Sequence, residues 1–197
     1  MARSATPYRI RIIGDPVLRE ATPDVTDIDG ALVQLVEDMF EVLYTTDTGV
    51  GLAAPQVGVG QRIFVYDIGD DDEPGVLINP RITESDGEWT YSEGCLSIPG
   101  QYFEIVRPKQ IEVSALDLDG NEITFEADEF WARLIQHELD HLDGVLMIDH
   151  LDEDQRTAAK KAVRELQMQA ADRSDLGRQG VGLASEAPAK KRFGLFS

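Results

Sequence analysis

The sequence QHELDHLDG, residues 136–144, places two histidines four positions apart, with a glutamate directly after the first. On an α-helix, positions four apart lie on the same face, so His137 and His141 can each direct a ring nitrogen at one metal ion. Glu138 is turned by about 100° from His137, which lets its carboxylate reach a water beside the ion without binding the ion itself. This spacing is typical of metal hydrolases.

A catalytic ion of this kind takes three protein ligands and leaves one position for water. In the extended pattern H-E-x-x-H-x-x-G-x-x-H the third histidine would fall where this chain has Met147, which disfavours a metzincin-type protease. His150 lies beyond the end of the helix, where an exposed or capping residue is expected. Glu153 and Glu165 are conceivable downstream ligands, but no supporting motif surrounds either residue.

Cys95 is an upstream candidate for the third ligand. It lies in EGCLS, residues 93–97, and three expected strands separate it from His137, so a sheet can bring it beside the helix. A lone cysteine is more often a small buried hydrophobic residue than a ligand. The polar turn around Cys95 is an unusual place for an inert core residue, and it favours the ligand interpretation.

Three helices are predicted to frame these residues, the first two from apolar periodicity and the third from acidic residues in its first turn and basic residues further along. The first runs from an N-cap at Asp29 to residue 44, the second from an N-cap at Asp128 to a stop at Gly144, and the third from Asp152 to about residue 172. Six short segments rich in β-branched and aromatic residues lie between the first two helices, at 63–68, 76–83, 88–92, 102–106, 111–116 and 122–125. We therefore expect an α+β fold, with mostly antiparallel sheets packed around a central metal-binding helix, an N-terminal helix and a C-terminal helix.

The 197 residues fit one catalytic domain at 1–172 followed by a flexible basic tail at 173–197. The net charge is −19, of which the tail contributes +3, so residues 1–172 carry −22. Such an acidic domain repels phosphate backbones, and DNA binding is not expected. No stretch has the apolar length of a membrane span or a secretory signal. With a single cysteine, the chain is expected in a reducing compartment, the cytoplasm.

Three stretches together resemble the signature motifs of a known family. They are GVGLAAPQVG at 49–58, EGCLS at 93–97 and QHELDH at 136–141. In order and spacing they are similar to the G-x-G-L-A-A-x-Q, E-G-C-L-S and H-E-x-x-H motifs of bacterial-type peptide deformylases. The resemblance extends from about Tyr8 to about residue 150. It implies a hydrolase that removes the formyl group from the N-terminal methionine of newly made polypeptides and releases formate.

The resemblance also implies the roles of individual residues. Cys95, His137 and His141 would hold one divalent ion, which in this family is usually ferrous iron, with zinc, nickel or cobalt able to take its place. Glu138 would act as general base and then as general acid. The side-chain amide of Gln56 and the backbone N–H of Leu96 would stabilise the oxyanion of the tetrahedral intermediate.

Substrate contacts follow from the same resemblance. Gly49, Val50 and Gly51 would pair with the backbone of the nascent peptide, where missing side chains allow close approach. Tyr91 and Leu134, each close to a motif, are candidates for the pocket of the methionine side chain. Glu93 would support the loop that carries Cys95, paired with Arg107.

Two rival functions share the same helix. One is a zinc peptidase that cuts ordinary peptide bonds, and the other is a binding or structural protein in which the cysteine and the two histidines hold a closed metal. The three intact motifs argue against the second rival. The third helix and the basic tail suggest a ribosome-binding element, since deformylation takes place on nascent chains, although a solubilising tail explains the same charge.

Overall fold

The computed structural model describes residues 6–69 and 73–178. Within these ranges seven strands pair antiparallel in two sheets. The larger sheet has the order β1-β2-β3-β6-β7, and the smaller sheet consists of β4 and β5. The strands are β1 (Gly51–Ala53), β2 (Ile63–Tyr66), β3 (Gly75–Asp86), β4 (Trp89–Cys95), β5 (Ile98–Arg107), β6 (Gln110–Leu116) and β7 (Glu122–Asp128).

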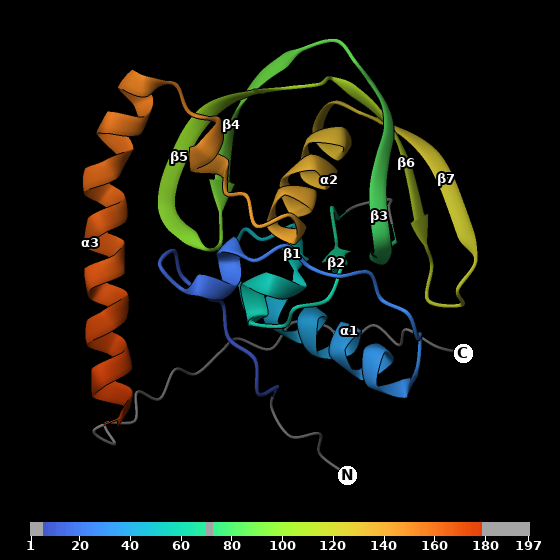
Figure 1. Cartoon of the computed structure of the whole chain (residues 1–197), viewed down its shortest axis with the longest axis horizontal. Helices are drawn as coiled ribbons and strands as arrows, with labels where there is room; N and C mark the ends of the chain where they lie inside the picture. Colours follow the sequence, from blue (N-terminus) through green and yellow to red (C-terminus); the bar gives the residue numbers. More distant parts are fainter. Residues whose placement is uncertain (1–5, 70–72, 179–197) are drawn as a thin grey trace.

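The α-helices of the described ranges are α1 (Gly30–Leu43), α2 (Glu129–Leu142) and α3 (Glu153–Arg178). Short 3₁₀ helices are η1 (Pro16–Arg19), η2 (Ala54–Val57) and η3 (Met147–His150). Helix α2 lies in the middle, with β4 and β5 on one side and β3, β6 and β7 on the other (Figure 1). The α+β arrangement around a central helix, predicted from the sequence, is therefore confirmed. No helix in the described residues is long and apolar enough to cross a bilayer.

The apolar side chains of α2, which flank its polar residues, hold the helix in the centre of the fold. Its buried apolar residues are Ala132, Leu134, Ile135, Leu139 and Leu142, which pack with side chains of β2, β3, β6 and β7. Each buried aliphatic side chain contributes about 1.5–3 kcal/mol, so this packing fixes the helix against the larger sheet. The histidines of α2 are thereby held on the side that faces β4 and β5.

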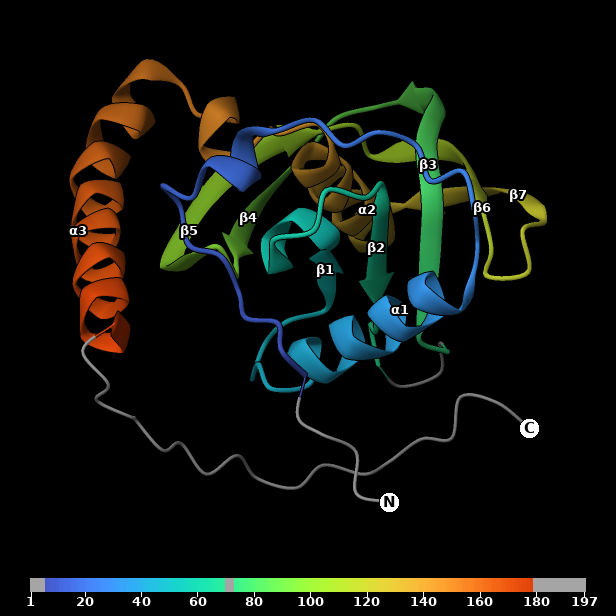
Figure 2. The ribbon, with the colours of Figure 1, turned by 60° about the horizontal axis from the view of Figure 1, so that its bottom comes forward.

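A separate apolar cluster supports the smaller sheet. It joins Cys95 and Ile98 of the β4–β5 turn to Ile13, to Met147 of η3 and to Ala159 of α3. Helix α3 accordingly stands beside β5 in both ribbon views (Figure 1, Figure 2). The N-terminal segment, η3 and α3 thus form the outer support of the strand that ends at Cys95.

The structure differs from the sequence prediction in one short strand and in the end of one helix. Strand β1 was not predicted, because its three residues, Gly-Leu-Ala, are too short and too small to show alternation. Helix α3 runs to Arg178 rather than ending near residue 172, so residues 173–178 of the predicted tail are helical. No proline interrupts this stretch, and Gly177 is its one poor helix former. The rest of the predicted tail, 179–197, lies outside the described residues.

The N-caps of α1 and α2 offer a matched test of helix capping. Asp29 accepts hydrogen bonds from the backbone N–H groups of Ala31 and Leu32 at 2.9 and 3.0 Å, whereas Asp128 makes no side-chain cap hydrogen bond. We expect Asp29→Ala to lower the free energy of unfolding by about 1 kcal/mol, and Asp128→Ala by clearly less, because only the first change removes cap bonds. Urea unfolding at a fixed metal load measures both values. Equal losses would show that charge at the helix end, and not the cap bond, provides the stabilisation.

Candidate metal centre and active site

Three potential metal ligands meet between α2 and the β4–β5 turn. One helical turn separates His137 from His141, whose ring centroids lie 5.1 Å apart. Cys95 is the last residue of β4, and its Sγ lies 3.3 Å from Nε2 of His141. One ligand atom from each residue can be chosen so that all three lie within 4.8 Å of one another. The structure therefore brings together the three residues predicted as ligands from distant parts of the sequence.

The chemistry of this group fits a divalent transition-metal ion. Bonds of about 2.3 Å to sulfur and 2.0–2.1 Å to nitrogen in a tetrahedron place the ligand atoms about 3.3–3.6 Å apart, close to the separation of Cys95 and His141. Burial alone would raise the pKa of the Cys95 thiol, but His141 and His137 hold this pKa well below its usual value. A thiolate beside two imidazoles is the ligand set that zinc and iron prefer.

Glu93 holds His137 from the side opposite the ligand cluster. Its Oε2 lies 3.0 Å from Nδ1 of His137, so a proton on Nδ1 leaves Nε2 free as a ligand. Burial would raise the pKa of the Glu93 carboxyl, but the hydrogen bonds of His137 and Arg107 keep it well below its usual range. Arg107 donates from Nε to Oε1 at 2.6 Å and from its terminal nitrogen to Oε2 at 3.0 Å.

Arg133 is a site residue that the sequence prediction missed. Its guanidinium donates to Oε1 of Glu93 and also to the backbone oxygens of Trp89 and Ile105. It lies over the rings of Trp89 and Tyr91, 5.0 and 5.7 Å from their centroids. Arg133 precedes His137 by one helical turn, so a charged residue on the ligand face of the helix was the available signal.

Glu138 lies at the closed end of the cavity. Its side chain is buried, and burial raises the pKa of its carboxyl above the usual value despite the opposing effect of His137 and His141. Oε2 has no hydrogen-bond partner among the described residues. A buried carboxylate oxygen without a partner is rare, and here it is an acceptor available for a water or a substrate group.

Gln56 presents its amide nitrogen to the same space. The carbonyl oxygen of its side chain accepts a hydrogen bond from the backbone N–H of Ala53 at 2.8 Å. This contact fixes the orientation of the amide, so Nε2 points at Sγ of Cys95, 3.8 Å away, and at Oγ of Ser97, 3.4 Å away. A donor is thereby held beside the candidate ligands.

A cavity of about 360 Å³ opens onto these groups. Its walls come from the segment before and within β1, from β4 and the β4–β5 turn, and from α2. Nearly all the residues predicted for the site line it, namely Gly49, Val50, Gly51, Gln56, Tyr91, Glu93, Cys95, Leu96, Leu134, His137 and Glu138. His141 lies buried beneath the cavity, and Arg107 lies behind Glu93.

Comparison with known proteins identifies the family. Residues 7–157 match the family model described as polypeptide deformylase. The chain belongs to the polypeptide deformylase family. Peptide deformylase 1 of Clostridium perfringens is 50% identical over 141 residues, which make up 72% of this chain and 95% of that protein.

Solved deformylase structures share the fold. The crystal structure of a peptide deformylase from Legionella pneumophila has a TM-score of 0.77 at 39% identity and covers 83% of this chain and 97% of its own. The deformylase from Thermotoga maritima has a TM-score of 0.70 at 47% identity, covering 74% and 97%. The resemblance inferred from three short motifs therefore holds over most of the chain.

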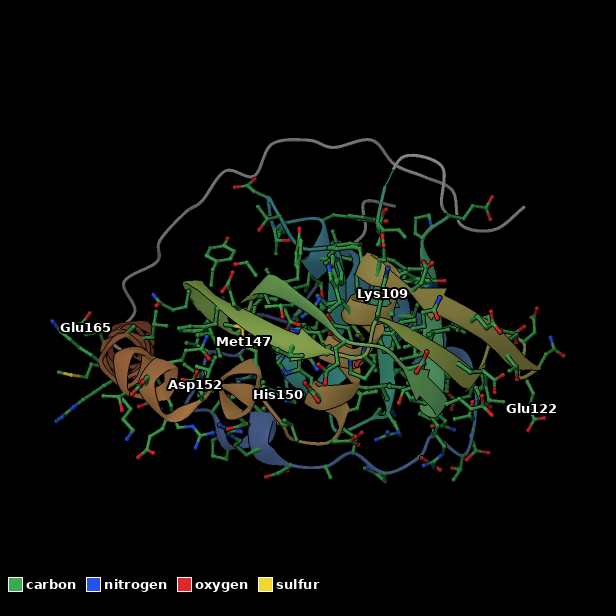
Figure 3. All side chains as sticks on the ribbon, turned by 90° about the horizontal axis from the view of Figure 1, so that it is seen from above. Lys109, Glu122, Met147, His150, Asp152 and Glu165 are labelled. Atoms are coloured by element: carbon green, nitrogen blue, oxygen red, sulfur yellow. The ribbon has the colours of Figure 1, made fainter. Side chains whose placement is uncertain are left out.

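The downstream residues weighed as ligands lie away from the cluster of Cys95, His137 and His141. Nε2 of His150 lies 2.7 Å from a carboxylate oxygen of Asp140, outside the ligand cluster. Glu165 stands on the outer side of α3, and His150 lies at the end of η3 (Figure 3). Glu153 is the exposed first residue of α3, and Met147 is buried in the cluster that supports the β4–β5 turn. The ligand set that the structure allows is therefore the one completed by Cys95.

The metal centre predicts the effect of removing its thiolate. Cys95→Ala should reduce the metal content to near zero, because two histidines alone form a weak site. Ser92→Ala, on the same strand but with an exposed side chain, should keep the wild-type metal content. Elemental analysis after gel filtration measures both. An unchanged metal-to-protein ratio in Cys95→Ala would exclude Cys95 as a ligand.

Proposed function

We propose that this chain removes the N-terminal formyl group from methionine of newly made polypeptides, with Cys95, His137 and His141 holding one divalent ion. The observation that carries the proposal is the cluster of these three residues beside Glu138 at the end of an open cavity, in a chain of the deformylase family. The reaction is the hydrolysis of a small amide, and formate is released. It takes place in the cytoplasm, where nascent chains are made.

The family is metal-dependent, and the resident ion proposed here is ferrous iron. Thiolate with imidazole suits iron and zinc alike, and zinc, nickel or cobalt would occupy the same ligands. When bound, the ion would supply Lewis acidity, which would lower the pKa of a water far below its value in bulk water and polarise the formyl oxygen. Glu93, in contact with Nδ1 of His137, would leave Nε2 of His137 free to hold the ion.

Glu138 moves the proton in this mechanism. Oε2, which has no hydrogen-bond partner among the described residues, accepts a proton from the attacking water, and the raised pKa of the buried carboxyl lets Glu138 keep that proton until the C–N bond begins to break. Glu138 then donates the proton to the leaving nitrogen. It is a base in the first step and an acid in the second.

Two N–H groups stabilise the charge that develops on the formyl oxygen. Nε2 of Gln56 is oriented toward the ligand cluster by the contact of its own oxygen with Ala53. The backbone N–H of Leu96, in the turn directly after Cys95, is the second donor. Donors fixed before the reaction cost no reorganisation, and one of them typically contributes about 2.7–4 kcal/mol of transition-state stabilisation.

The peptide backbone binds along β1, which is an edge strand of the five-stranded sheet within the described residues. Gly49 and Val50, directly before β1, and Gly51, its first residue, line the cavity, so an extended peptide can add to this edge by main-chain hydrogen bonds. A side chain at position 51 would be excluded, because a Cβ there would lie 2.5 Å from Oε1 of Glu138. Recognition through the backbone suits an enzyme that processes many sequences.

The methionine side chain enters the part of the cavity between β4 and α2. Leu134 is buried and Tyr91 is about half exposed, which makes one an apolar wall and the other a rim. Phe130 and Arg133 line the same side, with the Phe130 ring edge-on to Tyr91 at 6.5 Å between centroids. An aromatic and aliphatic surface of this kind favours the flexible thioether chain of methionine.

Glu138→Gln tests the mechanism. The variant should keep its metal, because Glu138 is not a ligand, and should lose about 10²- to 10⁴-fold in kcat, because an amide cannot accept the proton. The assay is formate release from formyl-Met-Ala by protein prepared without oxygen, with metal content measured on the same sample. Full activity of the metal-loaded variant would refute the mechanism.

The same preparation separates deformylation from its rivals. A deformylase releases formate from formyl-Met-Ala and no amine from unformylated Met-Ala, whereas a zinc peptidase gives the opposite pattern. A protein with a closed structural metal releases neither product. Wild-type protein is expected to show the first pattern.

The C-terminal part of the chain is proposed to contact the ribosome. The acidic domain is repelled by RNA, whereas residues 173–197 carry +3. Removing residues 179–197 should reduce co-sedimentation with ribosomes at low salt, and changing Lys190, Lys191 and Arg192 to Gln in the full chain should have the same effect. Unchanged co-sedimentation of both variants would assign the tail no role in ribosome binding.

A further inference from the structure

The aspartate of the QHELDH motif has no part in the proposed mechanism, although it lies on α2 between the two histidine ligands. Oδ2 of Asp140 is 2.8 Å from a terminal nitrogen of Arg107 and 2.7 Å from Nε2 of His150. Its side chain is 19% exposed, so both contacts are partly shielded from water. A shielded carboxylate with two donors is a candidate for a specific structural task.

These contacts form one continuous chain from the surface to a metal ligand. His150 contacts Asp140, Asp140 contacts Arg107, Arg107 binds Glu93, and Glu93 contacts Nδ1 of His137. Exposure falls along the chain, from 34% for the side chain of His150 to 5% for Arg107 and Glu93. Figure 3 shows the outer end, His150, at the end of η3. The chain links η3 and α2 through β5 and β4 to the metal centre.

The geometry of Arg107 gives this chain its effect. Its guanidinium is planar and rigid, so the contact of one terminal nitrogen with Asp140 also sets the direction of the edge that binds Glu93. Arg107 is almost fully buried, and a terminal nitrogen without Asp140 would lose a charged partner in a place that water barely reaches. Arg107 would then rotate or shift, and Glu93 would follow.

We propose that Asp140 and His150 are positioning residues for the metal ligand His137, acting through Arg107 and Glu93. Asp140 fixes the guanidinium of Arg107, and His150 fixes the carboxylate of Asp140. The inference rests on the proposed ligand set, and it adds two residues that touch neither the ion nor the substrate. Their effect is on how firmly the ion is held.

Asp140→Asn is the first variant, and Asp143→Asn is its matched control. Both residues lie at the end of α2 and lose one negative charge, but Asp143 pairs with Arg62 at 2.6 Å instead of Arg107. The measurement is the rate of zinc transfer from the loaded full-length protein to a coloured chelator. Loss of a direct partner of a ligating histidine changes metal affinity by about 10- to 100-fold. Asp140 lies two contacts beyond the direct partner Glu93, so Asp140→Asn is expected to speed zinc release by a smaller factor of about 3- to 10-fold, with the control within twofold of wild type.

His150 gives an independent arm with a rescue. His150→Phe keeps a ring but cannot donate to Asp140, and zinc release should accelerate about two- to fivefold. His150→Gln keeps a donor, and release should return toward the wild-type rate. Urea midpoints of the metal-free His150→Phe and His150→Gln proteins compare their stabilities. If the midpoints agree, a loss of stability cannot explain a difference in zinc release between the two variants.

Unchanged zinc release in Asp140→Asn, or equal acceleration in Asp140→Asn and Asp143→Asn, would overturn the inference. So would equal behaviour of the two His150 variants. Formate release by the wild-type protein is measured separately. Wild-type protein that holds zinc but releases no formate would refute the proposed function and leave the positioning chain standing.

Discussion

The arrangement of the candidate metal ligands depends on the ion pairs of the buried Glu93 carboxylate. A charge in the interior is tolerated only when it is paired, and Glu93 is paired with two arginines and a histidine. These partners come from β5 and α2, so satisfying one carboxylate fixes β4 relative to both. Cys95 lies two residues beyond Glu93 on the same strand. The position of the thiolate next to the histidines therefore follows from the pairing of Glu93.

A second constraint acts from the opposite wall of the cavity. Strand β1 runs so close to Glu138 that even a methyl group at Gly51 would collide with the carboxylate. Gln56, three residues after β1, is buried in the same corner and directs its amide at Cys95. Gly51, Gln56 and Glu138 therefore line one part of the cavity, beside Cys95.

The helices and strands that depend on nearby residues in the sequence were predicted correctly. The spacing of His137 and His141 defined a helix face, and apolar periodicity placed α1 and α2 within a residue or two. Enrichment in β-branched and aromatic residues predicted six of the seven strands in the described ranges. Strand β1 was not predicted because its pairing with β2, and not its own three small residues, makes it a strand. The role of Arg133 was not predicted because its partner Glu93 lies far away in the sequence, and no spacing rule connects the two residues.

The proposed ligand set, completed by Cys95 and not by a downstream residue, would tie the ion to tertiary structure. In the extended histidine pattern all ligands follow closely on one segment, whereas here one ligand comes from a two-stranded sheet that precedes the helix. A two-stranded sheet is marginal in isolation, and it gains stability by packing on a helix. The ion pairs of Glu93 and the metal ligands join the same two elements, so each reduces the entropic cost of the other. Metal binding by the proposed ligands would thus be coupled to the docking of β4 and β5 on α2, and an ion held by α2 alone would lack a thiolate.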